Sequence, residues 1–137
     1  MGTSLMVIAI KRIAMNERTS NVFTALCRHC VSIMDGWVPY PAWAIAQSCG
    51  LTLYQTRKEL HRLRDMGLCA VDTMILDRED YMLPYHGWQI TKEARATPQY
   101  QEAELQEAEL CAQCFGGTVE SYLKGWEILQ KGELLWE

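Results

Sequence analysis

The sequence predicts a mainly α-helical protein with a small β-wing, and three observations indicate this fold class. Apolar residues recur at steps of three and four through most of the chain, which is the period of amphipathic helices. Two neighbouring segments, 68–76 and 81–90, instead have the composition of paired strands. The chain has 137 residues, of which 49% are hydrophobic, so it is large enough to bury one core.

The chain begins with an ambiguous segment and continues with a clear helix. Residues 1–16 fit a short amphipathic helix, although the β-branched run 5–10 also fits a strand. In the next helix, apolar residues spaced by three and four run from Phe23 to Met34, and we expect Asp35-Gly36 to end it. Residues 37–41 then form a stiff aromatic connector, because each of its two prolines fixes its own φ angle.

Two helices joined by a tight turn are predicted between residues 41 and 66. Gly50 supplies the left-handed backbone position at which the first helix ends. Thr52 can cap the second helix with its side-chain hydroxyl group. A narrow stripe of the second helix is expected to face the first: Thr56, Leu60 and Leu63.

The order of short motifs in this region resembles that of a known family. The chain is similar to the winged helix-turn-helix regulators of bacteria and phages in four places: Ile45-Ala46, Gly50-Leu51-Thr52, Leu60-x-x-Leu63 and Met66-Gly67-Leu68. Segments 68–76 and 81–90 correspond to the wing strands, and Gly87 to Lys92 resembles the strand-to-helix exit of multiple-antibiotic-resistance regulators. The resemblance covers roughly residues 17–97 and implies a winged helix-turn-helix with extra N- and C-terminal helices, which identifies a fold more directly than a function.

The C-terminal part of the chain predicts two further helices. A tandem pentapeptide of good helix formers indicates a helix from Thr97 or Pro98 to Phe115. Gly116-Gly117 then interrupts the chain, and an apolar stripe that begins at Val119 marks the last helix. We expect these helices to pack on the N-terminal ones, within one chain or across the axis of a homodimer. The chain therefore divides into an N-terminal segment, a winged domain and a C-terminal pair of helices: 1–16, 17–97 and 98–137.

The net charge of −4 is unevenly distributed along the chain. Residues 1–97 hold 11 lysines and arginines against 9 acidic residues, whereas residues 98–137 hold 2 against 8. The excess acidity therefore belongs to the C-terminal helices. Segment 52–67 holds four basic residues against two acidic ones, which is compatible with contact to phosphates.

We expect helix 52–66 to enter the major groove of double-stranded DNA, as a sequence-specific transcriptional regulator would place it. Its first turns would read base edges, with Gln55 able to pair with adenine, while its arginines hold phosphates. An arginine at the wing tip is a candidate for the minor groove. The predicted DNA-binding residues are Tyr54, Gln55, Arg57, Lys58, His61, Arg62, Arg64 and Arg78.

Other features favour a different class, a winged-helix module for protein–protein interaction without DNA binding. Leu53 places an apolar side chain early in the helix, and three carboxylates surround Arg78 at the wing tip. No enzyme is predicted, since the sequence has neither a glycine-rich phosphate loop nor a metalloprotease or hydrolase motif. No apolar run is long enough to span a membrane, so we expect a cytoplasmic protein.

Two C-x-x-C pairs raise a second question: Cys27 with Cys30, and Cys111 with Cys114. Four thiolates in two pairs match the ligand count of a structural zinc site, and such pairs can also sense oxidants. Both pairs fall inside predicted helices, where cysteines three residues apart also form an ordinary apolar face. We expect packing, with no metal or other cofactor, and zinc binding and redox sensing remain as alternatives.

Overall fold

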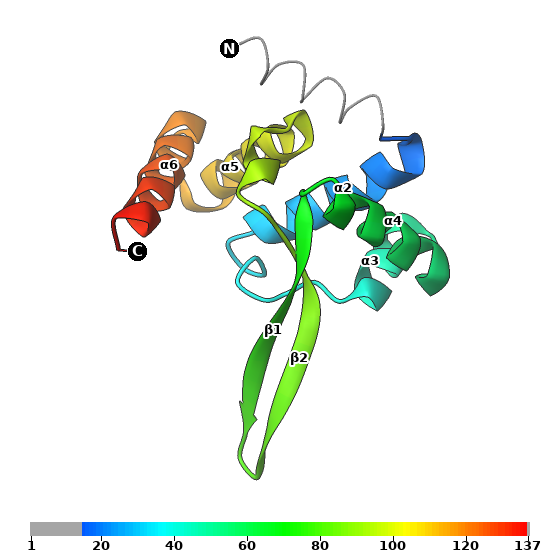
Figure 1. Ribbon diagram of the computed structural model, residues 1–137. Coiled ribbons are helices and arrows are strands. Elements are labelled where there is room, and N and C mark those ends of the chain that lie inside the picture. Colours follow the sequence, from blue (N-terminus) through cyan, green and yellow to red (C-terminus); the bar gives the residue numbers. More distant parts are fainter. Residues whose placement is uncertain (1–14, 137) are drawn as a thin grey trace.

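A helical body carries one long β-hairpin (Figure 1). The computed structural model describes residues 15–136, so the predicted helix or strand of residues 1–16 lies almost wholly outside the described part. The elements follow in this order: α2 (Glu17–Val31), α3 (Ala42–Cys49), α4 (Leu53–Asp65), β1 (Cys69–Arg78), β2 (Tyr81–Ile90), the 3₁₀-helix η1 (Glu93–Ala96), α5 (Pro98–Phe115) and α6 (Val119–Trp136). The predicted mainly helical class with a small antiparallel sheet is confirmed.

Helix α2 ends earlier than the sequence predicted. Its last residue is Val31 rather than a residue next to Asp35-Gly36, and Met34, expected on its apolar face, is 73% exposed. The cause is Ser32, whose hydroxyl oxygen accepts hydrogen bonds from the backbone N–H groups of Met34 and Asp35 at 3.3 and 3.4 Å. Serine side chains compete in this way with the helix for backbone donors.

The turn between α3 and α4 has the predicted construction. Gly50 adopts a φ of 65°, the left-handed conformation that glycine favours at a helix end. Thr52 caps α4, since its Oγ1 accepts a hydrogen bond from the Gln55 backbone N–H at 3.1 Å. The three residues of the predicted stripe on α4 are all fully buried: Thr56, Leu60 and Leu63.

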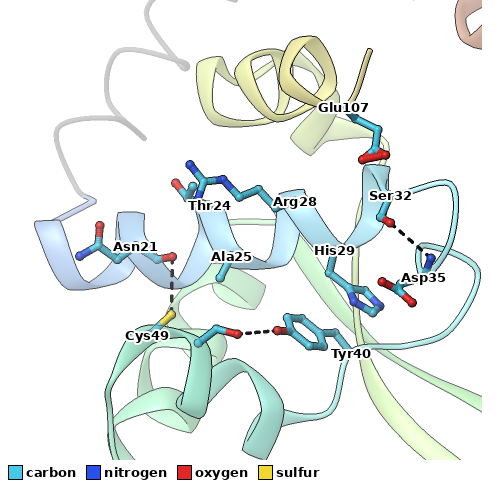
Figure 2. A pocket seen from close by; sticks show the side chains of 11 residues that line it. Asn21, Thr24, Ala25, Arg28, His29, Ser32, Asp35, Tyr40, Cys49 and Glu107 are labelled. Carbon is cyan, nitrogen blue, oxygen red and sulfur yellow. Dashed lines mark hydrogen bonds between the residues drawn. The ribbon is translucent and has the colours of Figure 1, made fainter. Parts of the chain in front are cut away.

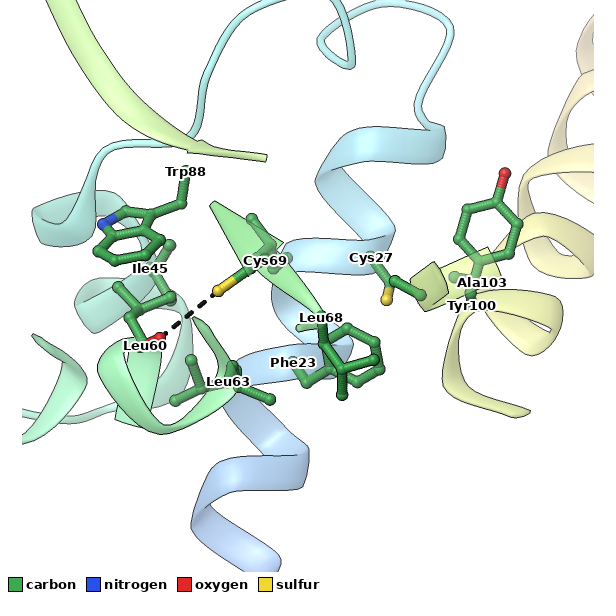
Figure 3. Close-up of a cluster of buried hydrophobic side chains, with 13 residues drawn as sticks. Phe23, Cys27, Ile45, Leu60, Leu63, Leu68, Cys69, Trp88, Tyr100 and Ala103 are labelled. Carbon is green, nitrogen blue, oxygen red and sulfur yellow. Dashed lines mark hydrogen bonds between the residues drawn. The ribbon is translucent and has the colours of Figure 1, made fainter. Parts of the chain in front are cut away.

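One core joins the N-terminal helices to α5 (Figure 3). Phe23 and Leu26 of α2 pack with the buried stripe of α4, and Tyr100 and Ala103 of α5 belong to the same cluster. Helix α5 therefore packs on α2 within one chain, and α6 packs in turn on α5. Both helices have the predicted positions, with the break at Gly116 and Gly117, whose φ angles are 82° and 85°.

We call residues 69–90 the hairpin arm; its strands pair from Cys69 opposite Ile90 to Arg78 opposite Tyr81. Strand β1 runs two residues further than predicted, and β2 has the predicted bounds. Only the base of the arm is anchored, by Cys69 and Trp88 in the core and by two backbone hydrogen bonds between Trp88 and Tyr40 at 2.8 and 3.0 Å. Ten residues of strand extend about 33 Å, and the rest of the arm projects away from the helices (Figure 1).

Candidate nucleic-acid interface

Helix α4 turns a polar and basic face to solvent. Thr56, Leu60 and Leu63 fix one side of the helix in the core. With 3.6 residues per turn, the middle of the opposite side is formed by Tyr54, Lys58 and His61, and by Asp65 at the C-terminal end of the helix. All four are exposed, and Tyr54 is 77% exposed. We call this row of residues the outer stripe.

On the side of α4 that faces the hairpin arm, an apolar cleft of 380 Å³ adjoins the outer stripe. Arg57 and Leu53 line it from α4, Trp43 from α3, and Val71 and Pro84 from the arm. The His61 ring meets Trp88 edge-on, with ring centroids 5.8 Å apart and planes at 84°. The orientation of α4 relative to the arm is therefore fixed by packing.

On the side that faces α2, a buried carboxylate holds one of the predicted arginines. Glu59 is 2% exposed; Thr19 of α2 donates a hydrogen bond to its Oε2, and Arg62 Nη1 lies 3.4 Å from its Oε1. The Arg62 side chain stays 47% exposed. Arg62 also lines a groove of 510 Å³ with Lys58 and with Arg18 of α2, and these three cations stand there against the carboxylates of Glu17 and Glu59. Arg18 was not predicted, because no local motif links it to a helix forty residues further along the chain.

The Gln55 side chain caps the N-terminus of α4 itself. Its Oε1 accepts a hydrogen bond from the Thr52 backbone N–H at 3.0 Å, which completes a reciprocal capping box with the Thr52 hydroxyl. Bidentate pairing with adenine needs both the oxygen and the nitrogen of the amide. The structure therefore places Gln55 in the cap, whereas the sequence predicts that it reads a base.

The remaining predicted residues lie further out. Arg64 is exposed, with its Nε 3.9 Å from the carboxylate of its neighbour Asp65. Arg78 is the last residue of β1, at the end of the arm that is distant from α4 (Figure 1). The structure thus brings six of the eight predicted residues together on the surface of α4: Tyr54, Arg57, Lys58, His61, Arg62 and Arg64.

The cysteines of α2 are part of the packed core. Cys27 is fully buried next to Cys69 (Figure 3), and the Cys30 thiol donates to Gln89 Oε1 at 3.3 Å. Burial raises the pKa of Cys30 to about 11 and that of Cys69 to about 12, so both thiols are protonated at neutral pH. Within residues 15–136, no group of three or more His, Cys, Asp or Glu side chains could hold a metal ion.

A polar hollow of 710 Å³ lies on the other side of α2 and α3 (Figure 2). His29 stacks on Tyr40 with ring centroids 4.1 Å apart, and the Tyr40 hydroxyl hydrogen-bonds Ser48 Oγ at 2.7 Å. The lining combines Arg28 with the carboxylates of Asp35 and Glu107. Because charges of both signs are present, the hollow selects no single class of ligand.

Comparison with protein-family models, with curated proteins and with solved structures finds no significant match to this chain. Among the helices in residues 15–136, none has the length and apolar character needed to cross a membrane.

Proposed function

We propose that the protein is a sequence-specific DNA-binding transcriptional regulator of the winged helix-turn-helix class, acting in the cytoplasm without enzymatic activity. In this proposal α3 and α4 are the helix-turn-helix, and the hairpin arm takes the place of the wing. The observation that carries it is the outer stripe, because its exposed side chains stand on a helix held by the core and flanked by arginines on both sides.

The proposed contacts follow from the dimensions of DNA. A helix of 10–12 Å diameter fits the major groove, which is about 12 Å wide. Tyr54 and Lys58 would then face base edges, while Arg57 and Arg62 on opposite flanks of α4 would contact phosphates of the two strands. Arg18 on α2 adds a further phosphate contact next to Arg62.

The proposal includes a homodimer formed through the N- and C-terminal helices. Large apolar side chains remain exposed on and next to α5 and α6: Leu105, Leu110, Phe115, Ile128 and Leu129. Exposed apolar side chains gathered on neighbouring helices favour association. A two-fold dimer would present two α4 helices to the half-sites of a pseudo-palindromic operator.

Selection from a pool of random DNA duplexes tests this function. The wild-type protein should enrich one sequence motif, and Tyr54→Ala should change the base preference at one or two positions within it. Lys58→Glu should abolish binding, whereas Lys124→Glu on exposed α6 makes the same charge change away from α4 and should leave it intact. Absence of binding by the wild type at low salt would refute the proposal.

A protein–protein interaction module is the second candidate, and the apolar cleft beside α4 favours it. Trp43 is 59% exposed there, next to Leu53 and Val71. The phosphate backbone of DNA has no apolar surface that could cover these side chains, whereas a protein partner can provide one. Trp43→Ala should leave DNA binding unchanged if α4 reads DNA, and should weaken binding of a protein partner if the cleft is the main site.

A further inference from the structure

The hairpin arm exposes apolar side chains on both faces. The most exposed are Val71, Ile75, Tyr81 and Met82, at 54 to 63%. A two-stranded hairpin that does not pack on anything is at most marginally stable in water. The arm is anchored at its base and projects away from the helices (Figure 1). Beyond Val71 and Trp88, its exposed side chains give it an apolar surface available to a partner.

Each edge of the arm lacks at least one of the backbone donors that a further strand would need. The backbone N–H and C=O groups of Trp88 point away from β1 and bond to Tyr40. Because backbone groups alternate in direction along a strand, those of Pro84, four residues earlier, point to the same outer edge, and proline has no N–H to donate there. On the outer edge of β1, the N–H of Thr73 is already bonded to Asp72 Oδ1 at 2.9 Å. A missing donor on each edge weakens pairing with a partner strand, which favours docking on a side-chain face of the arm.

One face of the arm is continuous with the cleft beside α4. The strand register places Val71 opposite Trp88, Ile75 opposite Pro84 and Asp77 opposite Met82, so these residues share a face. Val71 and Pro84 also line the cleft with Leu53 and Arg57. The cleft, the arm face and the outer stripe of α4 thus form one connected surface.

The charge of the arm indicates its partner. The arm carries four acidic residues, Asp72, Asp77, Glu79 and Asp80, against the single arginine Arg78. Phosphates would be repelled by this balance, whereas a basic protein surface would be attracted. The chain has such a surface on α4, but the tip of its own arm lies about 33 Å of strand away from the core. Contact between tip and α4 therefore requires a second copy of the chain.

We propose that the hairpin arms of two chains exchange. The two arms pack antiparallel across a two-fold axis through the face that contains Val71, Ile75, Pro84 and Met82, and each acidic tip lies on the basic face of α4 in the partner. Because side chains alternate between the faces, two strands of ten residues place about ten side chains of each chain on this face, about half of what a standard interface uses on one side, and the contact between tip and α4 adds to them. This proposal rests on the proposed function, because the acidic tip binds the same basic face of α4 that is proposed to bind DNA. The tip covers that face in the absence of DNA.

A charge exchange between two variants tests this contact without DNA. The tip variant carries Glu79→Lys and Asp80→Lys, and the helix variant carries Arg57→Glu and Lys58→Glu. All four positions are exposed, so the fold is expected to persist, and circular dichroism checks it. Each variant should associate with itself about tenfold or more weakly than the wild type, because like charges then meet at the interface.

Mixing the two variants should restore the association, because the lysines of one tip then meet the glutamates of the other α4. Sedimentation velocity on separate and mixed samples gives the comparison. A dimer formed through α5 and α6 would be present equally in every sample, so only the difference between mixed and separate samples reports the arm contact. The matched control is Asp35→Lys with Glu93→Lys, two exposed positions outside α4, the arm, α5 and α6, which should leave association at the wild-type level.

The uncharged part of the interface is tested by Ile75→Ser with Met82→Ser, which should weaken association at every salt concentration. Failure of the mixed variants to associate more strongly than the separate ones, or a difference between mixed and separate samples that added salt does not reduce, would overturn the arm exchange. The tip variant leaves α4 intact and should bind DNA at least as tightly as the wild type. If the protein associates through the arms but does not bind DNA, only the proposed function is refuted. If it binds DNA but does not associate through the arms, only the arm exchange is refuted.

Discussion

Removal of two cations from α4 should flatten the salt dependence of DNA binding. Four basic side chains are placed to contact phosphates: Arg57, Arg62 and Arg64 of α4, and Arg18 of α2. Each contact contributes about −0.9 to the slope of log affinity against log salt concentration, so each chain should lose about 150-fold in affinity between 50 and 200 mM salt. With Arg57→Ala and Arg64→Ala, two contacts remain, and the loss over the same range should be about 12-fold.

Fluorescence anisotropy with a labelled duplex, repeated at five or six salt concentrations, measures both slopes. Lys124→Ala on α6 is the control, because it removes an exposed cation far along the chain from α4 and should leave the slope unchanged. An equal slope for the wild type and the double variant would show that α4 does not contact phosphates. The slope is a better measure than affinity at one salt concentration, because partial unfolding weakens binding without changing the number of released counterions.

Three further predictions concern stability, and urea unfolding measures each of them. Gly87→Ala should destabilise the fold by about 1–3 kcal/mol, because the new Cβ would lie 2.6 Å from the Pro39 carbonyl carbon. Gly125→Ala in α6 is the contrasting variant: its new Cβ meets nothing within 4 Å, so it should stabilise the fold by up to about 1 kcal/mol. Glu59→Ala should cost about 1–3 kcal/mol by removing the acceptor of Thr19 and Arg62, and Glu59→Gln should recover part of the loss. The pKa of Cys30 rises from 9.0 to about 11 on folding, so its contribution to the free energy of unfolding should be constant below pH 9 and decline between pH 9 and 11. In Cys30→Ala, the free energy of unfolding should decline less over this pH range.

The backbone was largely predictable because its signals are local. Gly50 and Thr52 determine the turn into α4 through their own conformation and hydroxyl group, whatever lies nearby. The bounds of β2 and α5 follow in the same way from the composition of each segment. The end of α2 was missed because Ser32, which is unremarkable in sequence, finds two backbone donors within three residues.

The surface of α4 was less predictable, because its chemistry depends on distant residues. Glu59 reads as a solvent-exposed charge, yet Thr19 of α2 and Arg62 bind it in a buried position. Arg18 lines the groove beside Arg62 only because α2 packs on α4. The distribution of charge along the sequence indicates a basic helix. It does not show which of the side chains are bonded to other parts of the protein and which are available to a ligand.

Gln55 shows how this sorting bears on recognition, and it supports a sharp prediction. If its amide turned to pair with adenine, the Thr52 N–H would lose its acceptor, at a cost of about 1 kcal/mol against a gain in discrimination of about 1–3 kcal/mol. Gln55→Glu keeps the capping box, since glutamate is equally suited to that position, but a carboxylate has no N–H to donate to adenine N7. The variant should therefore bind DNA somewhat more weakly, through charge repulsion, and should select the same sequence as the wild type. A changed preference at an adenine would show that Gln55 leaves the cap to read DNA, whereas an unchanged one leaves base reading to Tyr54 and Lys58.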